Sequence, residues 1–355
     1  MKILNISKYS FDYKGGVEKE AKKVSEQLSE IHQVDNICFG KKSYEKKLSP
    51  NEKIISFKSL KFFNKVDLSI TQTLFLLRNV GKYNLVWLHY PNIIPAIALL
   101  FNKNVDIIIQ YQNDIKVLPL LYKFFKPFEN LILKRAKIII TSSPNYHKSS
   151  NALNSFEDKI KCIPIKIHKI PDLFQPIEPN GFDQIILTTI GRYTEYKGYE
   201  NIIKLVSNNQ KYKLNIISNS DFPSKINNLV NLSNNVEILR DLDDIEMNYV
   251  LKKSHVFILS SITRSEGFGI VLLEALRLGL PICVNKLKDT GSEFITIPGF
   301  NGEFFDIRDN SSLFIALDKI CNPSSYYKYS NGALEDFNSR FCLTEKKEFL
   351  SILKK

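Results

Sequence analysis

The segment Ser265–Ala275 (SEGFGIVLLEA) places two carboxylates eight positions apart, with a Gly-Phe-Gly turn directly after the first. Gly267 and Gly269 allow a ligand to approach the backbone closely, with the N–H groups facing an anion. We expect an apolar helix to follow, whose N-terminus adds about half a positive charge. Glu266 and Glu274 cannot bind a phosphate, so they suit hydroxyl groups. A diphosphate flanked by hydroxyls describes a nucleotide sugar; the alternative is a buried helix with one capping and one solvated glutamate.

Two other loops have residue types that suit an anion. The segment Gly191–Gly198 (GRYTEYKG) places Arg192 and Lys197 between an expected strand and an expected helix. Two fixed cations there would neutralise the charge that develops on a departing diphosphate, and we expect both to be exposed; ordinary surface charges are the alternative. The segment Tyr13–Glu18 contains a glycine pair that includes Gly16. Such a pair can open a helix toward a phosphate or can form a plain tight turn.

Short apolar runs alternate with longer amphipathic runs along the chain, which predicts parallel sheets covered by helices. The strands expected in the first half are 2–6, 34–39, 85–89, 106–111, 137–141 and 160–164, with helices over 17–31 and 118–135. In the second half we expect strands at 185–190, 213–217, 236–239, 255–259 and 281–285, and helices at 199–208, 222–231, 244–253 and 268–278. A proline-containing stretch separates the two halves. We therefore predict an α/β domain over 1–170, a linker over 171–183, a second α/β domain over 184–330, and a tail over 331–355 that ends in a helix at 344–353.

The net charge of +12 is concentrated in one half of the chain. Residues 1–175 contain 28 Lys and Arg against 15 Asp and Glu, a balance of +13, whereas residues 176–355 contain 21 against 22. This asymmetry suggests that an anionic partner docks on the first domain, although it could serve only solubility. Nucleic acid is not expected, because no recognition motif accompanies the charge.

Two basic segments rich in aromatic residues could meet a membrane surface. They are 58–65, preceded by Phe57, and 120–137. Basic amphipathic helices with aromatics lie well on anionic bilayers; the alternative is a helix whose aromatics pack into the core. Five scattered cysteines indicate reduced thiols of the cytoplasm. No apolar run reaches the ~20 residues of a membrane span, and the N-terminus lacks the pattern of a signal peptide. We therefore expect a cytoplasmic protein, peripheral on the inner face of the cytoplasmic membrane.

These motifs resemble the donor site of retaining glycosyltransferase family 4, especially bacterial members that build O-antigen or capsule. The similarity rests on Gly191-Arg192, Lys197-Gly198, Ser265–Gly269 and Glu274, with looser matches at 15–18, 89–92, 141–146, 162–165 and 289–291. It covers nearly the whole chain. It implies a GT-B fold, with two Rossmann-like domains facing across a cleft and a final helix that returns to the first domain. The first domain would hold the acceptor and the second the nucleotide sugar.

The resemblance also implies a role for each motif residue. Arg192 and Lys197 would hold the donor diphosphate, and Glu266 would contact hydroxyls of the donor sugar. The backbone of Gly267, Phe268 and Gly269 would face the sugar and phosphate. Glu274 would bind the ribose, and Gly16 would approach the diphosphate from the other domain. Such enzymes retain configuration and usually need no metal or other cofactor. We expect a transferred hexose, a UDP or GDP donor, and a saccharide acceptor that is linked to polyprenyl diphosphate.

One position departs from the family pattern. Related sequences often read Tyr-His-Ser-Asp where this chain has Tyr111–Asp114 (YQND), so that Gln112 replaces the usual histidine. Glutamine cannot take a proton at neutral pH. The substitution therefore argues against a mechanism in which a histidine at this position is the base, but not against one in which the leaving phosphate is the base. His89, Gln112 and Asp114 are candidate sugar or acceptor contacts, and His89 is equally explained as a structural residue. Because of Gln112, the alternative to an enzyme is a non-catalytic subunit that binds nucleotide or glycan.

A second acidic cluster, Asp241–Asp244 (DLDD), resembles a metal-binding motif of other transferases. It stands before an expected helix, so we predict that Asp243 is an N-cap and not a metal ligand.

Overall fold

The computed structural model describes residues 1–13, 15–62, 66–115, 119–170, 184–343 and 349–354. The chain divides into two compact units. Unit 1 comprises Met1–Ile163 with Glu345–Lys355, and unit 2 comprises Pro164–Thr344. The linker predicted over 171–183 lies outside the described residues, as do residues 344–348 of the last predicted helix.

Unit 1 is built on an eight-stranded sheet in the order β10-β9-β8-β7-β1-β2-β4-β3. All neighbouring strands are parallel except β3, which is antiparallel to β4. The strands are β1 (Lys2–Tyr9), β2 (Gln33–Gly40), β3 (Tyr44–Ser49), β4 (Glu52–Lys58), β7 (Leu85–Tyr90), β8 (Asp106–Tyr111), β9 (Ile138–Thr141) and β10 (Ile160–Cys162). A separate small hairpin consists of β5 (Leu60–Phe62) and β6 (Val66–Leu68). The strand order reverses between β1 and β7, so the carboxyl ends of these two strands mark a switch point.

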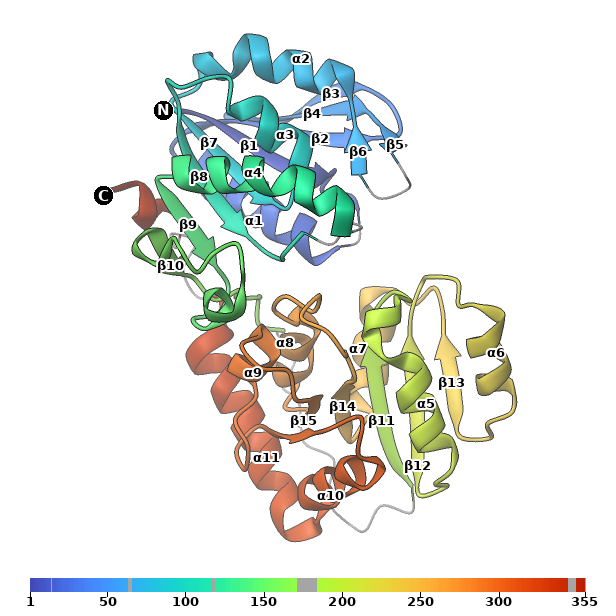
Figure 1. The fold of residues 1–355 in the computed structure, drawn as a ribbon. Coiled ribbons are helices and arrows are strands. Elements are labelled where there is room, and N and C mark those ends of the chain that lie inside the picture. Colours follow the sequence, from blue (N-terminus) through green and yellow to red (C-terminus); the bar gives the residue numbers. More distant parts are fainter. Residues whose placement is uncertain (14, 63–65, 116–118, 171–183, 344–348, 355) are drawn as a thin grey trace. The chain divides into compact units, whose positions relative to one another are not determined.

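Helices cover both faces of this sheet (Figure 1). α2 (Ile70–Asn79), α3 (Ile93–Leu99) and α4 (Pro119–Arg135) pack on the face that includes Leu4 and Val86. α1 (Gly16–Ser29) packs on the other face, with Ile3 and Leu85. Adjacent strand residues therefore serve opposite faces, as the period of two in a strand requires.

The end of the chain belongs to unit 1. Phe349 is fully buried, its ring packs edge-on against Trp87 with 5.5 Å between centroids, and its backbone N–H donates to Gln27 Oε1 over 3.1 Å. The turn of 3₁₀-helix at Leu350–Lys354 follows. These residues share the core of the α1 face, so the last turn of the chain completes the core of the first unit.

Unit 2 is a six-stranded parallel sheet in the order β13-β12-β11-β14-β15-β16. Its strands are β11 (Ile185–Ile190), β12 (Tyr212–Ile217), β13 (Val236–Leu239), β14 (Val256–Leu259), β15 (Ile282–Asn285) and β16 (Gly302–Phe305). One core contains residues of α5 (Tyr199–Ser207), α6 (Ser224–Asn231) and α10 (Asn310–Cys321). The other contains residues of α7 (Asp244–Lys252), α8 (Ile270–Leu276) and α11 (Pro323–Asp336), and a short α9 (Gly291–Ile295) follows β15. Strand order reverses between β11 and β14, which predicts a ligand site beyond the carboxyl ends of those two strands.

Several predicted elements differ from the structure. The helix predicted over 268–278 is shorter, at Ile270–Leu276. The segment 58–62 ends a strand and begins another, β5, so it is no basic helix, and residues 63–65 lie outside the described part. α11 runs through position 331, and the structure groups the chain up to Thr344 with unit 2. In the described residues, no helix is both long enough and apolar enough to cross a bilayer.

Candidate functional site

The motif residues of unit 2 lie at the switch point of its sheet. The loop 191–198 follows β11, and the segment 260–269 follows β14, its neighbour in the sheet. The carboxyl ends of parallel strands meet at one edge, so these two loops are neighbours although about seventy positions separate them.

A buried ion pair joins the two loops. Lys197 Nζ lies 2.5 Å from Glu266 Oε2, and each side chain is only 11% exposed. Ser261 Oγ donates to the same carboxylate oxygen over 2.9 Å. The prediction that Lys197 is exposed is therefore wrong, because its ammonium group turns inward to this carboxylate. Burying a charge pair is costly unless the geometry is good and further hydrogen bonds assist, and here the hydroxyl of Ser261 provides one.

Hydrogen bonds to backbone carbonyls also join these two loops. The carbonyl of Lys197 accepts a hydrogen bond from Ser260 Oγ over 2.7 Å, and the carbonyl of Tyr196 accepts one from the N–H of Ile262 over 2.7 Å. Gly198 has φ +68°, and a Cβ there would stand 2.3 Å from the Ser260 carbonyl oxygen. Glycine is required at this position for both the backbone angle and the close approach.

The first residue of α9, Gly291, packs against the Gly-Phe-Gly turn. The N–H of Gly291 donates to the Gly267 carbonyl over 3.1 Å. A Cβ on Gly291 would come within 2.3 Å of the Phe268 Cα, so only glycine fits against the turn. Phe268 is buried in the core of the α8 face, with its ring 6.2 Å from that of Phe341. The phenyl group therefore anchors the turn, while Gly269, at φ +84°, starts α8.

The second carboxylate of the motif lies on α8. Glu274 is 8% exposed. Burial lowers the pKa of the neighbouring Arg277 guanidinium, and the charge of Glu274 acts in the opposite direction. Arg277 also donates to Asn248 Oδ1 over 3.1 Å. Both glutamates of the motif are thus buried, so neither is the solvated side chain that the alternative of a plain core helix predicted.

Arg192, the other cation of the loop 191–198, is exposed as predicted. Tyr196 lies near Lys197, whose Nζ is 5.8 Å from the centre of the tyrosine ring. Burial raises the pKa of the Tyr196 hydroxyl, the Glu266 charge adds to the effect, and Lys197 and Arg192 oppose it. The phenol therefore stays protonated and can donate a hydrogen bond.

The candidate residues of unit 1 lie at its own switch point. Gly16 starts α1 after β1, and His89 is near the end of β7. His89 is 1% exposed, and its Nε2 lies 3.0 Å from Asn5 Oδ1. Because Asn5 Nδ2 donates to Asn36 Oδ1 over 2.8 Å, the Asn5 oxygen must accept the Nε2 proton of His89.

This assignment determines how His89 meets Gln112. The unprotonated Nδ1 of His89 faces Gln112 Nε2 at 3.5 Å. Burial lowers the pKa of His89 to about 3, so the ring is neutral near pH 7. His89 is therefore hydrogen-bonded to both Asn5 and Gln112, and its low pKa makes it a poor general base. Nearby, Asp114 accepts hydrogen bonds from Ser150 Oγ over 2.6 Å and Tyr111 Oη over 3.0 Å.

Three residues of the site were missed from the sequence. They are Ser260 and Ser261, at the end of β14, and Asn285, whose Nδ2 donates to the Ser261 carbonyl over 2.8 Å. The available signal was their position: Ser260 and Ser261 directly follow β14, which adjoins β11, and Asn285 is the last residue of β15, the next strand in the sheet. The prediction that Asp243 is an N-cap is confirmed. Its carboxylate caps α7 by accepting hydrogen bonds from the N–H groups of Ile245 and Glu246, each over 2.8 Å.

Comparison with known proteins agrees with this geometry. The family model described as Glycosyl transferases group 1 matches residues 173–330. The chain is 24% identical over 296 residues to O-antigen chain mannosyltransferase C of Escherichia coli, an alignment that covers 79% of each protein.

Solved structures share the fold over the whole chain. Sucrose-phosphate synthase of Thermosynechococcus elongatus matches with a TM-score of 0.77 at 19% identity, covering 100% of this chain and 98% of that one. Anabaena Alr3699/HepE, solved in complex with UDP and glucose, matches with a TM-score of 0.72 at 14% identity and with the same coverage. At these identities the likeness establishes the fold, which is the α/β GT-B class with two Rossmann-like domains. The chain is a glycosyltransferase, and residues 173–330 are the part that matches the group 1 model.

Proposed function

We propose that this protein is a retaining hexosyltransferase that transfers a sugar from a nucleotide diphosphate donor to a saccharide acceptor in bacterial cell-surface polysaccharide synthesis. The observation that carries the proposal is the buried Lys197–Glu266 pair at the switch point of the group 1 domain. The E. coli relative is named for O-antigen chain mannosyl transfer, which supports the O-antigen class of product.

The donor would use both charges of the pair. Both described hydrogen bonds to the Glu266 carboxylate go to Oε2, so Oε1 is the oxygen that can accept from a sugar hydroxyl. Lys197, together with the exposed Arg192, would stabilise the diphosphate as it departs. We expect Glu274 to bind the ribose and the backbone of 267–269 to face the sugar and phosphate. A UDP or GDP donor is proposed, with no metal or other cofactor; UDP and glucose are the ligands of the Anabaena protein.

The proposed chemistry breaks the bond between the anomeric carbon and the diphosphate oxygen. The acceptor hydroxyl attacks from the face that the diphosphate leaves, so configuration is retained. The acceptor proton passes to the departing phosphate, so the step does not require a base at position 112, where glutamine cannot take a proton. Gln112 Nε2 faces His89, and its carbonyl oxygen can therefore accept a hydrogen bond from a sugar hydroxyl.

The acceptor is proposed to bind unit 1 and to be linked to a lipid diphosphate. The excess of basic residues in the first half of the chain suits such an acceptor and an anionic membrane surface. The enzyme would then work in the cytoplasm, on the inner face of the cytoplasmic membrane.

A panel of UDP- and GDP-linked sugars tests the proposal. The correct donor should raise the melting temperature of the protein, because a ligand that binds only the folded state stabilises it. The same donor should be hydrolysed slowly without acceptor, and Arg192→Ala should abolish that hydrolysis. Binding without hydrolysis or transfer would favour the alternative, a non-catalytic nucleotide- or glycan-binding subunit, which the substitution at Gln112 makes worth testing.

A further inference from the structure

One layer of helices in unit 1 presents large apolar side chains to solvent. α2, α3 and α4 lie along one face of the sheet (Figure 1). The exposed apolar residues of this layer are Ile70, Leu74 and Leu77 on α2, Phe101 after α3, and Phe124, Phe128 and Leu131 on α4. On the opposite face, Ile31, just after α1, is the large apolar residue that is similarly exposed among the described residues.

The spacing shows that these residues form ordered stripes on two helices. On α4 they occupy positions i, i+4 and i+7 from Phe124, and on α2 the same positions from Ile70. Residues at this spacing share one side of a helix. Each helix also has an inward apolar side, with Leu76 on α2 and Ile132 on α4 fully buried. The core is therefore already filled, and the outer stripes need a different partner.

The charges of this layer have one sign. α2, α3 and α4 contain one acidic residue, Glu129, and it is 3% exposed. Its carboxylate accepts hydrogen bonds from Tyr90 and Tyr122 over 3.0 and 2.7 Å. The exposed charged residues of the three helices are Arg78, Lys123, Lys126 and Lys134. The outer surface is thus both apolar and basic.

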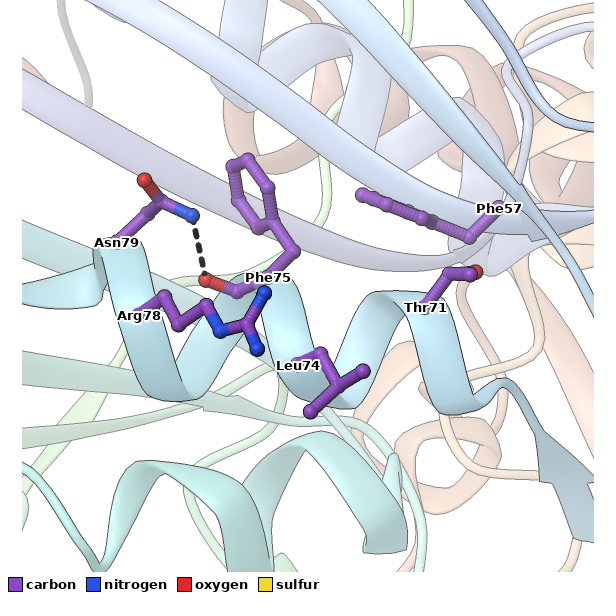
Figure 2. Close-up of a pocket in the computed structure, with 6 residues that line it drawn as sticks. All are labelled: Phe57, Thr71, Leu74, Phe75, Arg78 and Asn79. Atoms are coloured by element: carbon purple, nitrogen blue, oxygen red, sulfur yellow. Dashed lines mark hydrogen bonds between the residues drawn. The ribbon is translucent and has the colours of Figure 1, made fainter.

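A hollow beside α2 has the same mixed character (Figure 2). Phe57, Leu74 and Phe75 line it together with Thr71, Arg78 and Asn79. Apolar walls beside a cation match the acyl chain and phosphate of a phospholipid.

We infer that the outer surface of α2, α3 and α4 docks on an anionic phospholipid bilayer, with Phe124, Phe128 and Leu131 entering the headgroup boundary. Basic amphipathic helices bind such surfaces by combining apolar burial with attraction to anionic lipids. A second copy of the chain is less suitable, because it would bring like charges together. The inference extends the proposed function by stating where the enzyme meets its lipid-linked acceptor, but its evidence lies in unit 1 alone.

Vesicle sedimentation with the full chain tests this inference. The protein should bind phosphatidylcholine vesicles that contain phosphatidylglycerol, bind poorly to phosphatidylcholine alone, and dissociate in 1 M salt, where the screening length is about 3 Å. Lys123→Gln with Lys126→Gln should lower the partition coefficient about ten- to thirtyfold, since each lysine near an anionic surface adds about 1 kcal/mol. The matched control is Lys19→Gln with Lys22→Gln on α1, which removes two charges at the same spacing from the opposite face and should change binding less than twofold.

A second pair of variants tests the apolar contribution. Phe124→Ser should weaken vesicle binding about tenfold, whereas Ile31→Ser, at a similarly exposed position, should not. Equal losses from both lysine pairs, or no vesicle binding by the parent, would overturn the inference. So would a concentration-dependent dimer that Phe124→Ser dissociates, because a second copy would then cover the surface. Nucleotide-sugar binding measured in solution remains a separate readout of the proposed function.

Discussion

At the scale of single residues, the site depends on a pair of opposite charges that have little contact with water. Removing one member leaves the other buried and uncompensated, a change that costs about 3–5 kcal/mol. We expect Lys197→Ala to lose stability of that order and to reduce turnover by 10²-fold or more, because a charge partner of the transition state is lost. The double variant Lys197→Met, Glu266→Gln should recover most of the stability and none of the turnover. Urea unfolding and donor hydrolysis measure the two effects separately.

Arg192 provides the control for that experiment. It is exposed, so Arg192→Ala should change the unfolding free energy by less than about 0.5 kcal/mol while reducing turnover to a similar extent. If Lys197→Ala were as stable as Arg192→Ala, the pair would contribute nothing to folding.

The nucleotide contact is tested at Glu274. Glu274→Gln keeps the volume of this buried side chain but removes its charge. If the carboxylate binds the ribose, the affinity for the free nucleoside diphosphate should fall by about 1.5–3 kcal/mol. Calorimetry with the diphosphate alone measures this, and an unchanged affinity would exclude the ribose role.

The sequence could predict which residues are chemically suited to the site, but not how they pair. Arg192, Lys197, Glu266 and Glu274 stood out by type and spacing. That Lys197 turns inward to Glu266 depends on two strands adjoining in the sheet, which local pattern does not reveal. For the same reason Ser261, an ordinary serine in the sequence, was missed although it donates to the same oxygen.

At the scale of elements, the site depends on loops that touch through glycine. Gly291→Ala would force a Cβ into the backbone of Phe268, so it should both destabilise unit 2 and weaken donor binding. Gly299 is a suitable comparison, because it has φ +74° and nothing within 4 Å of the position of its Cβ. Gly299→Ala should cost only the ~1–2 kcal/mol of a left-handed backbone and leave donor binding intact. Equal donor affinity in both variants would show that the turn tolerates the displacement.

The regular part of the fold was predictable, and its exceptions have physical reasons. β11 (IILTTI) and β13 (VEIL) consist mostly of apolar and β-branched residues, which favour strands, and both were predicted with their observed bounds. β3 was not predicted, because Tyr44–Ser49 is an edge strand whose side chains are half charged and mostly exposed. α2 was also missed, since its apolar residues surround the helix and obscure the period of 3.6.

At the scale of the whole molecule, the two units differ in how they are assembled from the chain. Phe349→Ala should destabilise unit 1 by about 3–5 kcal/mol, the usual cost of removing a buried phenyl group, without affecting unit 2. Phe101→Ala, at a position 75% exposed, is the matched control and should leave stability unchanged. Hydrogen exchange resolves the two units: protection should fall in β1 and β7 of the Phe349 variant and not in β11 or β14.

The position of Phe349 also has a consequence for biosynthesis. The ribosome makes most of unit 1 first, but the aromatic ring that closes its α1-side core emerges only after residues 164–344 have been added. At 5–20 residues per second that interval is on the order of 10–40 s. During this time the nascent first unit has Trp87 and its neighbours uncovered, and chaperones that recognise apolar surface can bind there. Completion of the first unit is therefore delayed until unit 2 has been synthesised, so a chain that terminates early within unit 2 has a first unit whose core is open.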